Sequence, residues 1–158
     1  MQEGPFAQRH DPLLWTVALA VVAVDAMSKT WALEALSGEH WRLPGLALHV
    51  SLDTDSAPWL GAGAIAIMGV FDLFVLGVLA ILAREIRTAP WAVAAGFAAG
   101  AAASDFIDRL ARPPGLLQGA LVHWIETEWM ASFNLADGAL ILAAVLAAAL
   151  SSRRGRGV

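Results

Sequence analysis

Four long apolar runs constrain the fold of this chain more than any other feature. They lie at about 13–36, 60–83, 89–110 and 133–150. Each is close to or above the roughly 20 residues that a helix needs to cross about 30 Å of hydrocarbon. Of all residues, 58% are hydrophobic and only 15% are charged, whereas soluble domains have about 45–50% and about 25%. We therefore predict an all-α membrane protein, a bundle of four transmembrane helices that forms a single integral membrane domain over 1–158.

The composition also excludes several kinds of site. The chain has no cysteine, so disulfides, thiolate zinc sites and cysteine nucleophiles are ruled out. Its formal net charge is -4, and no basic stripe of the kind that neutralises phosphates occurs along the sequence. Nucleic acid is therefore not an expected partner.

The distribution of arginine predicts how the spans are oriented. Basic residues lie before the first run, between the second and third runs, and at the end of the chain: Arg9, Arg84, Arg87, Arg153, Arg154 and Arg156. Segments rich in Lys and Arg stay on the cytoplasmic side of a membrane. We expect a multi-pass protein with both termini in the cytoplasm and the connections 37–59 and 111–132 outside. The first run is longer than the apolar core of a signal peptide, so we expect it to be retained as a span.

The two outward connections have different hydrophobic patterns. Residues 46–52 nearly alternate between apolar and polar types, which predicts a short β-like segment on the outer membrane surface. Residues 116–130 place Leu117, Leu121 and Trp124 on one helical face. That spacing predicts an interfacial helix.

Ionisable side chains occur inside the predicted spans, where each costs several kcal/mol unless it is paired or lines a wet cavity, and in three spans polar residues form sets with a common spacing. The sets repeat at helical spacing: Asp25, Ser28 and Lys29; Asp105, Asp108 and Arg109; Asn134 and Asp137. Counting about 1.5 Å per residue places all three sets in the outer leaflet. We therefore predict a water-accessible acidic pocket there, roofed by the two outward connections.

Ion pairing is the structural alternative for some of these residues. Asp25 with Lys29, and Asp108 with a cation, could simply fix helix packing, and Asp72 in the second run is expected to pair with a cation or a backbone group. Asp137 is different, because it has no basic neighbour in the sequence. We interpret Asp137 as a functional residue.

Three motifs resemble those of the lipoprotein signal peptidases, also called signal peptidase II, which are four-span aspartic proteases of the bacterial inner membrane. Residues 25–29 are similar to the family's Asp-x-x-(Ser/Thr)-Lys motif, and residues 104–109 to Gly-Asn-x-x-Asp-Arg. Residues 133–137 match Phe-Asn-(Leu/Ile)-Ala-Asp without a change. The resemblance covers nearly the whole chain, and the three motifs occur in order at matching places of the predicted topology.

The resemblance implies a role for Asp137 and a departure at its partner. Two aspartates form the catalytic dyad of that family, and Asp137 corresponds to one of them. The other belongs to a Val-Val-Asp-Phe segment that aligns with 121–124, which places His123 at the aspartate position. A further motif, Asn-x-Gly-Ala-Ala-Phe, corresponds to 53–58, where Asp53 and Asp55 replace Asn and Gly. Asp105 likewise replaces an asparagine.

These departures leave three hypotheses. The first is an intramembrane aspartic endopeptidase that removes signal peptides from diacylglyceryl-modified prolipoproteins, with Asp137 acting beside His123 and with Asp108 or Glu126 in place of the missing aspartate. The second is a relative with altered chemistry in which a carboxylate–histidine set holds Mg²⁺, Mn²⁺ or Zn²⁺. The third is an inactive protein that binds a lipid or a membrane partner.

The first hypothesis assigns the remaining polar residues to substrate binding. These residues are Asn134, Arg109, Asp105, Asp53, Lys29 and Asp25. The hypothesis requires no cofactor, and its partners are membrane lipid and the lipid-modified prolipoprotein, with the enzyme as a monomer. The metal alternative would use Asp105, His123 and Asp137 as ligands, with Asp53, Asp55 and Asp108 nearby.

Overall fold

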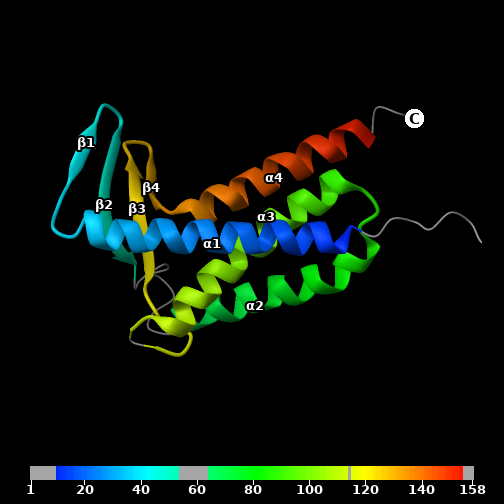
Figure 1. Cartoon of the computed structure of the whole chain (residues 1–158), viewed down its shortest axis with the longest axis horizontal. Helices are drawn as coiled ribbons and strands as arrows, with labels where there is room; N and C mark the ends of the chain where they lie inside the picture. Colours follow the sequence, from blue (N-terminus) through cyan, green and yellow to red (C-terminus); the bar gives the residue numbers. More distant parts are fainter. Residues whose placement is uncertain (1–9, 54–63, 114, 155–158) are drawn as a thin grey trace, which may run out of the picture.

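The computed structural model describes residues 10–53, 64–113 and 115–154. These residues form four α-helices that lie side by side and a small sheet at one end of the bundle (Figure 1). The helices are α1 (Asp11–Ala35), α2 (Ala64–Leu82), α3 (Ala89–Ala111) and α4 (Leu135–Arg154), with a short 3-10 helix at Ala83–Glu85 after α2. The four apolar runs therefore form helices close to their predicted bounds.

Three of these helices, α1, α2 and α4, are long and apolar enough to cross a membrane. Their outward faces carry large exposed apolar side chains such as Leu19, Phe74 and Ile81. An apolar surface of this kind suits a hydrocarbon environment, where backbone polar groups are satisfied within each helix. The described residues thus form a largely helical membrane protein.

Helix α3 is the central helix of the bundle and contacts α1, α2 and α4. Its inward residues are small, and Gly96 and Gly100 face α1. A Cβ atom at Gly96 would lie 2.7 Å from the carbonyl oxygen of Leu14 and 2.7 Å from the Cβ of Val17. Glycines at this spacing allow two helix backbones to approach closely in a membrane. The close packing of α1 on α3 fixes the relative height of their polar residues.

The sheet contains four antiparallel strands in the order β1-β2-β3-β4. The strands are β1 (Trp41–Leu43), β2 (Leu46–Asp53), β3 (Leu121–Thr127) and β4 (Met130–Phe133). Gly45, with a φ of 76°, makes the tight turn between β1 and β2. The β-like segment predicted at 46–52 is confirmed as β2, and its pairing with β3 brings the two connections together.

The predicted interfacial helix over 116–130 is wrong. Residues 121–127 form β3, and Leu117 before it has a φ of 64°, which is incompatible with a continuous right-handed helix. Val122, Trp124 and Ile125 are residue types that favour strands. The apolar spacing fits either structure over so short a segment, and pairing with β2 decides in favour of the strand.

Candidate functional site

Asp25 connects three helices at the sheet end of the bundle. Its Oδ2 accepts a hydrogen bond of 2.5 Å from the hydroxyl of Ser104 on α3. Its Oδ1 accepts one of 3.0 Å from the backbone N–H of Ala136 on α4. The side chain is fully buried. Asp25 therefore fixes the start of α4 against α1 and α3, which is a structural role.

Lys29 lies one turn further along α1 and supplies the positive charge for this buried region. Its Nζ is 2.5 Å from Asp25 and 2.8 Å from Asp108, while Asp105 is more distant at 3.7 Å. The other oxygen of Asp108 accepts a hydrogen bond of 2.7 Å from Nε of Arg112. Both oxygens of Asp108 are therefore held by cations, which leaves Asp108 poorly placed for the proton transfers of a dyad.

Arg109 reaches from α3 to α2, where its Nε lies 3.3 Å from Oδ2 of Asp72. This contact confirms the prediction that Asp72 pairs with a cation. One terminal nitrogen of Arg109 is buried and has no hydrogen-bond partner within the described ranges. Arg109 thus retains a donor that a bound molecule could use.

Asn134 and Asp137 cap the first turn of α4. The backbone N–H of Asp137 donates to the side-chain oxygen of Asn134 at 3.0 Å, and the N–H of Asn134 donates to Oδ2 of Asp137 at 2.9 Å. This reciprocal arrangement satisfies two amides at the helix start, and the helix dipole favours a negative charge there. Asn134 is fully buried, whereas the side chain of Asp137 is 34% exposed. The cap therefore holds the Asp137 carboxylate in a fixed orientation with about a third of its surface exposed.

His123 on β3 lies beside this carboxylate. Its Nε2 is 3.6 Å from Oδ2 of Asp137, and its side chain is 12% exposed. The structure thus brings His123 to Asp137, as the predicted alignment requires. Because 3.6 Å exceeds the range of a hydrogen bond, the two side chains are neighbours without being hydrogen-bonded.

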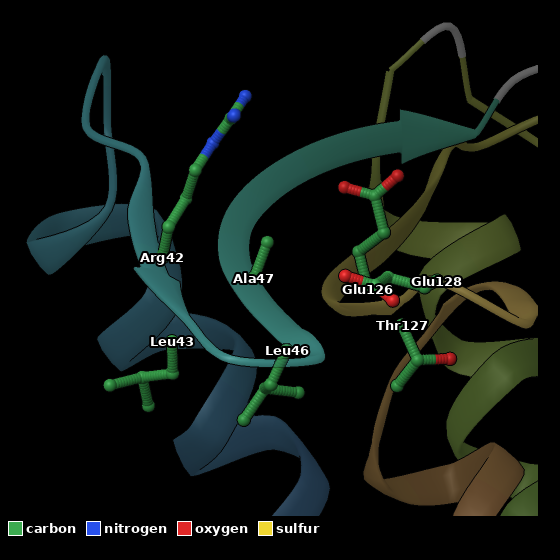
Figure 2. A pocket seen from close by; sticks show the side chains of 7 residues that line it. All are labelled: Arg42, Leu43, Leu46, Ala47, Glu126, Thr127 and Glu128. Carbon is green, nitrogen blue, oxygen red and sulfur yellow. The ribbon is translucent and has the colours of Figure 1, made fainter.

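Glu126 does not take the place of His123. It lies three residues further along β3, about 10 Å away at the usual strand rise. Its carboxylate is 3.4 Å from Nδ1 of His49 and lines a separate pocket of about 230 Å³ at the turn end of the sheet, together with Arg42 and Glu128 (Figure 2). The proposed substitution of Glu126 for the missing aspartate has no geometric support.

The predicted residues of the first outward connection are only partly described. Asp53 is the last residue of β2, where it pairs with Leu121 at the start of β3. Asp55 lies outside the described residues. Asp53 therefore lies near the rim of the region that contains His123.

The metal alternative requires several ligands around one point. Within 10–53, 64–113 and 115–154, no three His, Asp or Glu side chains are grouped so that they could hold one metal ion. The predicted set of Asp105, His123 and Asp137 is consequently not a ready-made metal site.

Two members of the site were not predicted from the sequence. Ser104 donates to Asp25, and Arg112 donates to Asp108. The spacing of Arg112, four residues after Asp108, is a signal that could have identified that pair. No comparable signal exists for Ser104, because its partner lies on another helix.

Similarity to known proteins agrees with this geometry. The sequence profile of the family described as Signal peptidase (SPase) II matches residues 17–152. The chain belongs to the signal peptidase II family. The family predicted from the three motifs is thus confirmed.

Relatives of this family match most of the chain in sequence, and two solved structures match it in fold. A lipoprotein signal peptidase of Streptomyces coelicolor is 33% identical over 149 residues, covering 92% of this chain and 73% of the relative. One from Bifidobacterium longum is 35% identical over 134 residues, covering 82% and 72%. Two solved bacterial membrane enzymes share the fold, with TM-scores of 0.74 and 0.76 at 21% and 20% identity, over 93% and 88% of this chain and 92% of each structure.

Proposed function

We propose that this chain is an active lipoprotein signal peptidase, an intramembrane endopeptidase that removes signal peptides from diacylglyceryl-modified prolipoproteins. The named relatives support the substrate class. The observation that carries the proposal is the capped, partly exposed carboxylate of Asp137 at the polar end of an apolar bundle. This is the group that can activate a water molecule next to a membrane-embedded peptide bond.

The proposed membrane arrangement has four spans. Helix α3 would cross the membrane inside a ring formed by α1, α2 and α4, so that its charged end is shielded from lipid. The sheet would lie on the outer face of the bacterial inner membrane, and both termini would lie in the cytoplasm. The whole chain would act as one monomeric domain, surrounded by membrane lipid.

Hydrolysis would begin at Asp137. The ionised carboxylate accepts a proton from a water molecule, and the water oxygen attacks the carbonyl carbon that precedes the lipid-modified cysteine. Two buried donors without a partner among the described residues, Nδ2 of Asn134 and a terminal nitrogen of Arg109, would hold substrate carbonyl groups. Asp53 would contact the substrate at the rim. Asp25 and Lys29, which are buried and paired, would act by positioning the helices.

Replacing Asp137 by asparagine tests this proposal. The side-chain amide introduced by Asp137→Asn keeps an oxygen that can accept the N–H of Asn134, so the cap and the fold should survive. We expect the purified Asp137→Asn variant to lose cleavage of a diacylglyceryl-modified prolipoprotein by at least about 100-fold, the scale of general base catalysis.

The matched control is Glu126→Gln, which makes the same carboxylate-to-amide change in the separate pocket. This variant should cleave at the wild-type rate. Cleavage by a folded Asp137→Asn variant at the wild-type rate would refute the proposal.

A further inference from the structure

The proposed hydrolysis needs a second group beside Asp137, because one carboxylate cannot both accept a proton from water and protonate the substrate at the same moment. Most carboxylates near the site already have hydrogen-bond or ion-pair partners. Both oxygens of Asp25 accept hydrogen bonds, and each oxygen of Asp108 contacts a cation. Asp72 faces Arg109. The oxygens of these three groups are thus already engaged by cations and hydrogen-bond donors.

Asp105 is the exception. Its nearest cation is Lys29 at 3.7 Å, which is beyond hydrogen-bond distance, and Lys29 lies closer to two other carboxylates. Oδ1 of Asp105 is buried and has no hydrogen-bond partner among the described residues. The side chain as a whole is 19% exposed, so water reaches it from the other side. A carboxyl group in this setting is free to hold and release a proton.

Asp105 on α3 and Asp137 on α4 belong to helices that Asp25 joins. The two oxygens of Asp25 bind Ser104 and Ala136, which immediately precede Asp105 and Asp137 in the chain. Nζ of Lys29, which is 3.7 Å from Asp105, is also 2.5 Å from Asp25, whose other oxygen holds the N–H of Ala136. Short contacts through Lys29 and Asp25 therefore join Asp105 to the first turn of α4, where Asp137 lies.

His123 is less suited to the same role. Its Nε2 lies 3.6 Å from Oδ2 of Asp137 and makes no hydrogen bond to it, and a carboxylate–imidazole pair is not the pair of carboxyl groups sharing one proton on which an aspartic protease depends. A histidine at this distance packs against Asp137 and limits the positions that its carboxylate can take.

Resting on the function proposed above, we infer that Asp105 is the second catalytic carboxylate and forms the dyad with Asp137 across the α3–α4 contact. His123 then acts as a positioning residue for Asp137. In this chain the dyad is built from two helices, and β3 supplies no carboxylate to it.

The proton balance of the reaction follows. Asp137 takes a proton from water while the water oxygen bonds to the carbonyl carbon, and Asp105 donates its proton to the carbonyl oxygen. In the resulting gem-diol, one hydroxyl proton returns to Asp105 as the carbonyl reforms. Asp137 gives its proton to the amide nitrogen as the carbon–nitrogen bond breaks. The products are the carboxylic acid end of the signal peptide and the free amino group of the lipid-modified cysteine, and both aspartates regain their starting state.

The first test is the isosteric variant Asp105→Asn, with Asp105→Ser as a second variant. Because Asp105 makes only one long ionic contact among the described residues, both variants should fold and keep a thermal unfolding midpoint near that of the wild type. We expect each to lose cleavage of a diacylglyceryl-modified prolipoprotein by at least about 100-fold. A folded variant of either kind within tenfold of the wild-type rate would overturn the inference.

A rescue experiment separates catalysis from structure. The double variant His123→Asp with Asp105→Asn moves the second carboxylate to β3, where the side chain of His123 faces Asp137. We expect it to recover at least tenfold over Asp105→Asn alone, and a folded double variant without recovery would count against the inference. If Asp137→Asn is inactive while Asp105→Asn is active, this inference fails and the proposed function stands. If Asp137→Asn is itself active, the proposed function fails.

Discussion

Lys29 lies among three carboxylates in the interior of the bundle, and the balance of these charges holds the site together. The pairing of Lys29 with Asp25, four residues apart on one helix, could be predicted from spacing alone. Its contact across to Asp108 could not, because that contact depends on the rotation of α3 against α1. Likewise, the sequence indicates that Asp72 needs a cation, but only the packing of α2 on α3 identifies Arg109 as its partner.

Removing the charge of Lys29 should destabilise the protein strongly. A Lys29→Met variant leaves Asp25 buried and without its cation, and breaking a buried pair in this way costs about 3–5 kcal/mol. The free energy of unfolding, measured in detergent, should therefore fall by about this amount. The control is Arg87→Met, which removes a cation from the exposed contact with Glu85 at 3.8 Å and should cost less than about 1 kcal/mol. If the free energy of unfolding fell equally in the two variants, the buried network would contribute little to stability.

At the scale of elements, the apolar runs predict the four helices well because each run is long and uniform. The segment 121–127 shows why shorter elements are harder to predict. A short segment with apolar groups at several positions fits a helical or an extended pattern, and the choice is made by pairing with β2, which lies far earlier in the chain. The site depends on this choice, because strand geometry is what directs His123 to Asp137.

The approach of α1 to α3 gives a prediction at the same scale. Gly100→Ala would place a Cβ atom 2.6 Å from the Cβ of Val21 and 2.8 Å from the carbonyl oxygen of Ala18, so the helices would have to separate. We expect a loss of about 1–3 kcal/mol in the free energy of unfolding, together with reduced cleavage, because Asp25 would shift from Ser104.

Gly77→Ala is the matched control for this variant. A Cβ atom at Gly77 would meet nothing within 4 Å. The variant should therefore be neutral or slightly stabilising, since alanine is the better helix former. Equal stability of the two variants would contradict the importance of the close α1–α3 contact.

For the whole molecule, the sheet and the polar residues lie at one end of the helical bundle, and the connection between α2 and α3 lies at the other (Figure 1). The order of the helices and the clustering of their polar residues could be predicted from runs and spacing. Two features could not: that α3 is the central helix, and that the two connections join in one sheet. Both arise from contacts between residues far apart in the chain.

The proposed orientation can be tested directly because the chain has no cysteine. Glu39 and Arg87 are both exposed and lie at opposite ends of the bundle. In intact cells, a membrane-impermeant maleimide should label Glu39→Cys, while Arg87→Cys should be labelled only after permeabilisation. The reverse pattern would place the site on the cytoplasmic side and refute the proposed topology.

The most direct test of the central claim, that this chain cleaves lipoprotein precursors with carboxylates of its own helices, is mass analysis of a cleavage reaction. Purified protein would be incubated with a diacylglyceryl-modified prolipoprotein, with and without a metal chelator. We predict one cut immediately before the modified cysteine at a rate that the chelator leaves unchanged, since Asp105 and Asp137 carry the protons. An intact precursor, or cleavage that the chelator abolishes, would contradict the account.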